Sequence, residues 1–180
     1  MNLEGLPYRL ELMTMAHVPT VAAIETAVFS RPWSLANFVH EVTDNLYSEY
    51  LVLRYTPWVE QDEDKRRGSA FLQNLFRKEK EDRSILGYGG LWLMVDEAHI
   101  STLAVRPAWR GRGLGEVLLA ALIARGMARQ AAYATLEVRR TNLVAQNLYR
   151  KYGFEYVGLR RGYYLDNNED ALIMTTAPLA

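Results

Sequence analysis

The chain has 180 residues, of which 49% are apolar, and its 21 basic and 21 acidic side chains give a formal net charge of zero. This length predicts one domain with its own core, and the balanced charge predicts neither a nucleic-acid partner nor an anionic membrane surface, so any anion site must be local. The lack of cysteine excludes disulfides, thiolate zinc sites and a cysteine nucleophile and favours a cytoplasmic location, and we expect no signal peptide and no membrane span because no long apolar run is present.

The first third of the chain predicts a strand, two helices and another strand. Apolar periodicity places them, in order, at 8–13, 17–29, 35–42 and 49–55. Pro32 ends the first helix because proline restricts the residue before it. Ser34 can cap the second helix.

Residues 58–83 differ from the rest of the chain in their density of charge. This composition predicts a solvated insertion within a single domain that spans 1–180. Four apolar residues in it fit one face of a short helix, namely Phe71, Leu72, Leu75 and Phe76. The sequence leaves open whether that face covers the domain or docks a partner.

The second half predicts alternating strands and helices. The strands are expected at 85–95, 100–105, 134–138, 154–165 and 171–176, with a turn at 96–97 and helices at 113–129 and 142–152. Glycines at 87, 89 and 90 indicate a bulge or a close backbone approach, and Gly153 ends the last helix. The β-α-β order over 100–138 predicts one parallel pair with a right-handed crossover. The fold class is therefore α/β of the α+β type: a mixed, mostly antiparallel seven-stranded sheet with helices on both faces.

A glycine-rich turn joins the strand at 100–105 to the next helix. It consists of Arg110, Gly111, Arg112, Gly113, Leu114 and Gly115. A helix N-terminus has unpaired N–H groups and a partial positive charge, and glycine lets a phosphate approach them. This turn therefore predicts a phosphate site. Positive charge would come from Arg106, Arg110 and Arg112. Alternatively, the glycines serve the turn's dihedral angles alone. The Walker pattern is absent, and the dinucleotide fingerprint requires glycine where Glu116 stands.

The same turn resembles a known cofactor motif. Arg110-x-x-Gly113-x-Gly115, after Ala104-Val105-x-Pro107, is similar to the R/Q-x-x-G-x-G/A motif of the GNAT N-acetyltransferases. The resemblance extends to Ile24-Glu25, 32–34, 136–139, Asn142, 147–149, 153–154, 160–164 and 170–174. Together these segments resemble the RimI branch of that family, the ribosomal-protein alanine N-acetyltransferases, over nearly the whole chain except 58–83, which departs from the compact pattern.

The resemblance implies that acetyl-CoA is the cosubstrate. Its pyrophosphate would lie on backbone N–H groups of the turn, and its pantetheine would run beside the preceding strand like an added strand. The implied cofactor-binding residues are Leu103, Ala104, Val105, Arg110, Gly111, Arg112, Gly113, Leu114, Gly115, Glu116 and Asn142. The N–H of Val105 would orient the thioester carbonyl. By residue type alone, Asn142 predicts a helix N-cap.

Two further residues carry the implied catalysis. Glu137 ends a buried strand, and a carboxylate there is either paired with an arginine or functional; the resemblance implies that it is the general base. Tyr149 has the spacing of a core tyrosine, whereas the resemblance implies that it protonates the leaving thiolate. The amine would attack the thioester directly in a ternary complex, which agrees with the absence of cysteine.

The resemblance also implies an acceptor site for a protein N-terminus, in this branch the N-terminal alanine of a small-subunit ribosomal protein. Loops at 31–34 and 161–164 would embrace the peptide through Trp33, Tyr163 and Tyr164, and Glu25 would neutralise a basic second residue. From residue types alone, Trp33 is a packed side chain after a helix-breaking proline, and the tyrosines are a surface pair.

Two other functions remain open from the sequence. One is acetylation of a different amine, such as a lysine, polyamine or antibiotic; the other is a catalytically silent CoA-binding module that docks a partner through 58–83. The oligomeric state is open as well. His17, His40 and His99 lack metal-site spacing, so we expect no metal and interpret all three as surface or packing residues.

Overall fold

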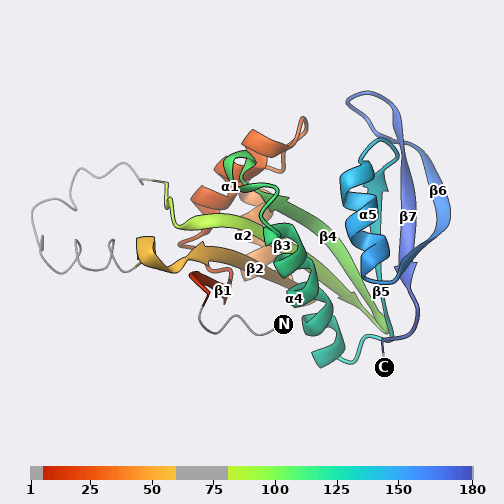
Figure 1. Cartoon of the computed structure of the whole chain (residues 1–180), viewed down its shortest axis with the longest axis horizontal. Helices are drawn as coiled ribbons and strands as arrows, with labels where there is room; N and C mark the ends of the chain where they lie inside the picture. Colours follow the sequence, from red (N-terminus) through yellow and green to blue (C-terminus); the bar gives the residue numbers. More distant parts are fainter. Residues whose placement is uncertain (1–5, 60–80, 180) are drawn as a thin grey trace, which may run out of the picture.

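The computed structural model describes residues 6–59 and 81–179 (Figure 1). The elements are, in chain order, β1 (Tyr8–Leu12), α1 (Val18–Val28), α2 (Leu35–Thr43), β2 (Ser48–Tyr55), β3 (Ile85–Met94), β4 (Glu97–Val105), the 3-10 helix η2 (Pro107–Trp109), α4 (Leu114–Ala128), β5 (Tyr133–Arg139), α5 (Leu143–Lys151), β6 (Phe154–Tyr164) and β7 (Glu169–Thr176). Most of the expected charged insertion, including its apolar face with Phe71, Leu72, Leu75 and Phe76, lies outside the described residues.

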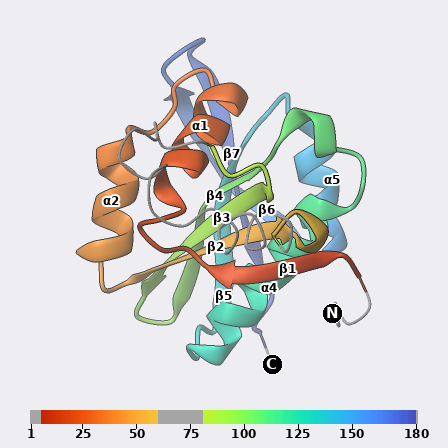
Figure 2. The same cartoon turned by 90° about the vertical axis from the view of Figure 1, so that its left-hand side faces the viewer.

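The strands form one seven-stranded sheet in the order β1-β2-β3-β4-β5-β7-β6. Within the described chain only β4 and β5 pair in parallel, and every other pairing is antiparallel. Helices α1 and α2 pack on one face of the sheet, and α4 and α5 pack on the other (Figures 1 and 2). One apolar cluster lies under α1 and α2, and two others include residues of α4, one of them with α5. The predicted mixed sheet with helices on both faces is therefore confirmed.

Local signals set most boundaries of these elements correctly. Ser34 caps α2 by accepting a hydrogen bond from the N–H of Asn37 at 3.2 Å. The strand expected from Ile100 begins instead at Glu97, because the turn falls at Val95 and Asp96, where Val95 adopts a φ of +52°. No helix in the described part of the chain has both the length and the apolarity needed to cross a membrane.

Gly90 of β3 confirms the expected bulge, and it also makes room for a side chain. A Cβ at this position would lie 2.2 Å from the ring of Tyr50, and the register of β3 on β4 shifts between Gly90 and Leu91. The Tyr50 hydroxyl lies 3.2 Å from the Ser101 Oγ atom on β4. The glycine therefore lets an aromatic ring lie flat across the sheet and reach the next strand.

The parallel pair β4–β5 is short, and the two strands then separate. Their register runs only from Glu97 opposite Tyr133 to Ile100 opposite Leu136. Beyond that point β4 continues along β3 to Val105, while β5 continues along β7 to Arg139. Figure 1 shows the two strands diverging away from the end at which they pair. The edge of β4 that faces β5 thus lacks a strand partner after Ile100.

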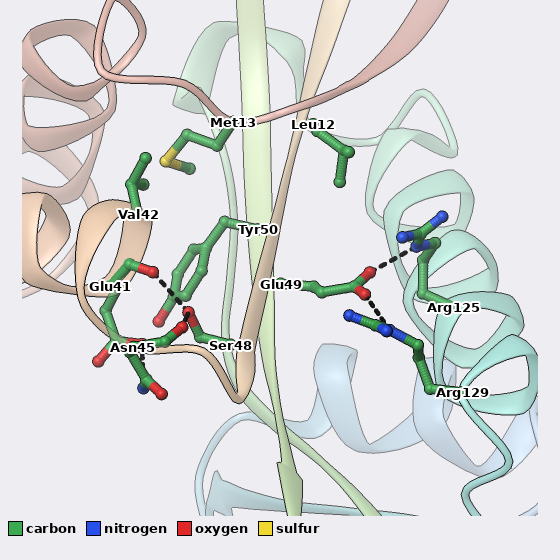
Figure 3. A pocket seen from close by; sticks show the side chains of 10 residues that line it. All are labelled: Leu12, Met13, Glu41, Val42, Asn45, Ser48, Glu49, Tyr50, Arg125 and Arg129. Carbon is green, nitrogen blue, oxygen red and sulfur yellow. Dashed lines mark hydrogen bonds and ion pairs between the residues drawn. The ribbon is translucent and has the colours of Figure 1, made fainter.

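Glu49 of β2 joins the sheet to the C-terminal end of α4. Its side chain is 7% exposed and accepts from the Nε atoms of Arg125 and Arg129, each at 2.5 Å (Figure 3). Burial opposes ionisation of Glu49, but the two guanidinium groups outweigh it and hold the pKa of the carboxyl below its ordinary value. The beginning of β2 also borders a cavity of about 270 Å³, which these arginines, Tyr50 and part of α2 help to line. Glu49 and the two arginines are paired with each other, and Glu41 accepts from the Asn45 amide and the Trp92 indole, so we interpret this cluster as structural.

We expect Glu49→Gln to lower the free energy of unfolding by about 1–2 kcal/mol at pH 7, because both guanidinium groups lose their charged acceptor. The folded-state pKa of Glu49 is depressed, so its contribution is present above the unfolded-state pKa and is lost as the pH falls through the folded-state value. Urea unfolding at neutral pH and at about pH 3 measures this. The exposed Glu155→Gln is the control; a loss of the same size at both pH values would contradict the assignment.

Candidate active site

The glycine turn before α4 has the backbone conformation that only glycine adopts without strain. Gly111 has a φ of +74°, and Gly113, the N-cap residue of α4, has a φ of +76°. A Cβ at either position would meet no protein atom within 4 Å. The turn therefore requires glycine for its dihedral angles. The same glycines leave the outer surface of the turn free of side chains, so the structural requirement is compatible with a phosphate site.

The N–H groups of this turn have no acceptor in the part of the chain that the structure describes. Among the described residues, none of the backbone N–H groups from Gly111 to Glu116 donates a hydrogen bond, and the first helical bond runs from Val117 to the Gly113 carbonyl at 3.1 Å. No side chain caps the helix. Unpaired donors at the positive end of a fifteen-residue helix suit a phosphate group. The turn thus fits the predicted pyrophosphate.

Two of the three arginines considered for this site stay at the turn. The Arg110 Nε atom donates to the Val105 carbonyl at 3.2 Å, and the Arg112 guanidinium lies 4.6 Å from the centre of the Trp109 ring. Arg106 is held elsewhere: it donates to the Ile85 carbonyl at 2.6 Å and pairs with Glu81 at 2.5 Å. Arg110 and Arg112 therefore supply the positive charge near the turn.

Leucine, alanine and valine at 103–105 form the end of β4, directly before the turn. The N–H of Arg106 donates to the Leu86 carbonyl on β3 at 2.8 Å. Because N–H groups alternate in direction along a strand, the N–H of Val105 points to the other edge, toward β5. Arg110 reaches the Val105 carbonyl on that same edge. The β4 edge that the predicted pantetheine would follow is thus continuous with the turn.

Two remaining cofactor candidates have partners of their own. Asn142 caps α5, as its residue type predicts, because its side chain accepts from the Ala145 N–H at 3.2 Å. The Glu116 carboxylate pairs with Lys151 at 2.5 Å and accepts from the Tyr152 hydroxyl at 3.2 Å, so its side chain faces α5. Only the backbone of Glu116 is left for a ligand at the turn.

Glu137 lies where β5 has left β4, and its carboxylate is held by two donors. His99 Nε2 lies 3.1 Å from one carboxylate oxygen and an Arg160 nitrogen lies 3.1 Å from the other, while the Glu137 side chain is 6% exposed. The hydrogen bond from His99 lowers the pKa of Glu137 most; burial opposes it, and the charge of Arg160 adds to it. Glu137 is therefore ionised at neutral pH, as a proton acceptor must be.

His99 is a packing residue, as one of the two sequence interpretations has it, but it makes a contact that the sequence did not predict. Its side chain is 14% exposed, stacks on Trp92 and also contacts the candidate base. The parallel pairing places His99 opposite Thr135, two residues before Glu137 on the same face of the sheet. The contact between His99 and Glu137 depends on the register of two strands that are far apart in the sequence. In the sequence, only the β-α-β order indicated that these strands pair.

Tyr149 is both a core residue and a candidate proton donor. It is 9% exposed, belongs to the apolar cluster under α4 and α5, and packs against Phe154 with ring centres 5.9 Å apart. Burial alone raises the pKa of Tyr149 to about 12. Within the described residues its hydroxyl has no hydrogen-bond partner. Tyr149 therefore keeps its proton at neutral pH and is free to donate it.

Glu25 is buried beside Trp33. Only 4% of the residue is exposed, and its side chain accepts from the Trp33 N–H at 3.0 Å and from the Tyr88 hydroxyl. Burial raises the pKa of Glu25, although both donors oppose that effect. The carboxylate therefore positions the chain at Trp33, and its contact with a basic substrate residue stays a prediction. Trp33 itself is half-buried and stacks on Trp92, with ring centres 6.1 Å apart.

The second predicted loop, 161–164, is the end of strand β6. Tyr163 is 44% exposed and lies edge-on to Tyr164, with ring centres 5.2 Å apart. Burial raises the pKa of both tyrosines, and the negative charge of Glu137 adds a smaller effect. Arg160, which pairs with Glu137, lies 5.5 Å from the centre of the Tyr163 ring, so Tyr163 lies near the candidate base.

Arg139 of β5 ties the two predicted acceptor segments together. Its guanidinium stacks 3.9 Å from the centre of the Tyr164 ring and pairs with Asp166 at 2.9 Å and Glu169 at 3.1 Å. Asp166 in turn accepts from the hydroxyl of Ser30, which precedes the segment with Trp33. The structure thus brings the segment after α1 against the β6–β7 hairpin, an arrangement that no local sequence signal predicted.

Comparison with protein families and curated sequences gives one consistent result. Residues 35–154 match the family model described as "Acetyltransferase (GNAT) family". A protein of Bacillus subtilis (strain 168), provisionally named a ribosomal protein bS18-alanine N-acetyltransferase, is 34% identical over 162 residues, which cover 90% of each chain. The ribosomal protein bS18-alanine N-acetyltransferase of Haemophilus ducreyi is 32% identical over 154 residues, or 84% of this chain and 87% of the relative.

Solved structures agree with these matches. The crystal structure of the ribosomal-protein-S18-alanine N-acetyltransferase from Escherichia coli has a TM-score of 0.72 at 26% identity and covers 96% of this chain and 94% of its own. Arabidopsis thaliana Naa50, solved in complex with a bisubstrate analogue CoA-Ac-MVNAL, has a TM-score of 0.70 at 16% identity, covering 96% and 99%. The latter similarity shows a shared fold.

Proposed function

This chain belongs to the acetyltransferase (GNAT) family, which uses acetyl-CoA, and we propose that it acetylates the N-terminal α-amine of a protein, namely the N-terminal alanine of ribosomal protein bS18. The names of the two curated relatives state this substrate, and both relatives match most of this chain. We further propose that residues 1–180 form a single acetyltransferase domain with a charged insertion at 58–83. A cytoplasmic location would follow from a ribosomal-protein substrate.

One observation carries this proposal: the glycine turn with its unpaired N–H groups, the edge of β4 beyond Ile100 and Glu137 follow one another on the same side of β4. The turn from Gly111 to Glu116 has free N–H groups, and Arg110 joins it to the end of β4. Glu137 stands on β5, beyond the last pair of the two strands. A phosphate-bearing carrier held at the turn would therefore extend its acyl end between the separated strands and toward the base.

The residues supply both proton transfers that acetylation of an amine requires. Acetyl-CoA, when bound, provides the thioester that the amine attacks. The ionised Glu137 accepts the proton of the attacking amine, directly or through a water, and the Val105 N–H orients the acyl carbonyl. The Tyr149 hydroxyl, with its pKa raised to about 12, gives its proton to the departing sulfur.

The low pKa of Glu137 favours an α-amine over a lysine as the acceptor. A carboxylate held ionised by His99 and Arg160 is a weak base. An α-amine has a pKa of about 7.7–8.0, so about a fifth to a third of it is neutral at pH 7.4, whereas a lysine, with a pKa of about 10.4, is about a thousandth neutral. A weak base is sufficient only in the first case.

The test of the proposed function is a peptide panel assayed with acetyl-CoA. Peptides that begin with Ala-Arg should be acetylated on the α-amine, and changes at the first two positions should lower kcat/KM. The matched control is the same peptide with a blocked N-terminus and an internal lysine. Turnover of the blocked peptide, or of small amines alone, would assign a different acceptor, and CoA binding without turnover would indicate a silent module.

Glu137→Gln should lower kcat by about 100-fold or more, since general-base catalysis typically contributes about 10²–10⁴-fold. The KM for acetyl-CoA should stay within about 2-fold, because the glycine turn does not contact this side chain. Steady-state kinetics at saturating peptide measures both constants, with Glu155→Gln as the control. A large loss of acetyl-CoA affinity would instead make Glu137 a structural residue.

Gly113→Val should weaken CoA binding by about 10-fold or more, because the new side chain strains a residue at φ +76° and projects over the unpaired N–H groups. Gly153→Val is a closely matched control: its φ is +80°, a Cβ there also meets nothing within 4 Å, and it ends α5. Calorimetric titration with CoA and thermal unfolding separate the effects. Equal CoA affinity in the two variants would remove the phosphate interpretation.

A further inference from the structure

His99 is a half-buried titratable side chain to which the proposed reaction gives no part. It lies on β4 with Nε2 at 3.1 Å from a Glu137 carboxylate oxygen. The groups that face it come from three strands: Glu137 and Thr135 on β5, Glu97 on β4 and Trp92 on β3. Arg160 of β6 meets Glu137 on its other oxygen. The imidazole is thus enclosed by acceptors and one aromatic ring.

Thr135 holds the far side of the His99 ring. Nδ1 of His99 lies 2.9 Å from the Thr135 hydroxyl oxygen, and that hydroxyl also donates to Glu97. Nε2 faces the Glu137 carboxylate at 3.1 Å, a hydrogen-bond distance that requires a proton between the two atoms. Nε2 is therefore the ring nitrogen through which His99 can hold Glu137.

The plane of the His99 ring is set by a stack of aromatic rings. His99 lies parallel to Trp92, with centres 5.7 Å apart and planes 21° apart, and Trp92 lies parallel to Trp33, with centres 6.1 Å apart and planes 18° apart. Trp92 is itself held because its indole N–H donates to Glu41 at 2.9 Å. The stack therefore couples the orientation of Glu137 to Trp33, the residue predicted to meet the acceptor.

Of the two donors on Glu137, His99 is the fixed one. The His99 side chain is 14% exposed and held on three sides, whereas the Arg160 side chain is 54% exposed. A long exposed arginine keeps most of its rotamer freedom. The direction in which the carboxylate points thus depends on the imidazole.

We propose that His99 is a positioning residue for Glu137: it donates a hydrogen bond that fixes the carboxylate toward the incoming amine. This rests on the proposed function of Glu137 as the base. The proton of the amine still passes to Glu137, and His99 forms and breaks no covalent bond with substrate.

Two variants of His99 separate the hydrogen bond from the stacking. His99→Phe keeps an aromatic ring against Trp92 but removes the donor, and His99→Gln restores a neutral donor without the stack. We expect kcat to fall by about 10- to 100-fold in His99→Phe, the effect typical of a misplaced catalytic group, with the KM for acetyl-CoA unchanged. His99→Gln should recover part of that loss. The exposed His40→Gln is the control and should match the wild type.

The second measurement does not depend on turnover. Carbon-13 NMR titration of the Glu137 carboxyl should show its pKa rising in His99→Phe, because burial remains while the largest lowering influence is lost. The acid limb of the pH profile of kcat/KM should move to higher pH in step. An unchanged Glu137 pKa, or full activity of His99→Phe, would overturn the proposal.

The double variant with Glu137→Gln distinguishes failure of this inference from failure of the proposed base. If Glu137 acts and His99 positions it, His99→Phe should cost little more activity in the Glu137→Gln background. If Glu137→Gln alone leaves kcat intact, the proposed base is wrong, whereas additive losses would show that His99 acts independently of Glu137.

Discussion

The separation of β4 from β5 is the constraint on which the rest of the site depends. The two strands pair over four residues each and then follow different neighbours, so that neither edge finds a partner in the described chain. An unpaired sheet edge inside a domain leaves backbone donors and acceptors that need a partner. The edge of β4 beyond Ile100 is therefore a place where an extended ligand can add on like a further strand.

The anion-binding part of the site is built from backbone and not from side chains. Left-handed glycines turn the chain directly from the strand into α4, and the helix starts without a side-chain cap. Its first N–H groups are consequently free, and their dipoles are aligned. Arg110 adds positive charge and also binds the Val105 carbonyl at the end of β4, a contact that joins the turn to the strand.

The acceptor side is organised by polar contacts between distant segments. Buried Glu25 holds the backbone at Trp33, and Arg139 links Ser30, through Asp166, to the β6–β7 hairpin. Glu137 is held by His99, which stacks on Trp92 and, through it, on Trp33. The candidate base and the segments expected to grip the substrate therefore belong to one connected network, so that a change in one is felt by the others.

Local patterns in the sequence determined the element order, the parallel pair, the glycine turn, the cap of α2 and the family resemblance, because periodicity, glycine and capping residues act over a few positions. Only the tertiary structure decided that His99 meets Glu137, that Glu25 is buried under Trp33 and that Arg139 connects the acceptor segments. Each of these contacts depends on the register and twist of strands far apart in the chain, and side-chain pairing across such strands leaves no periodic signal in either one.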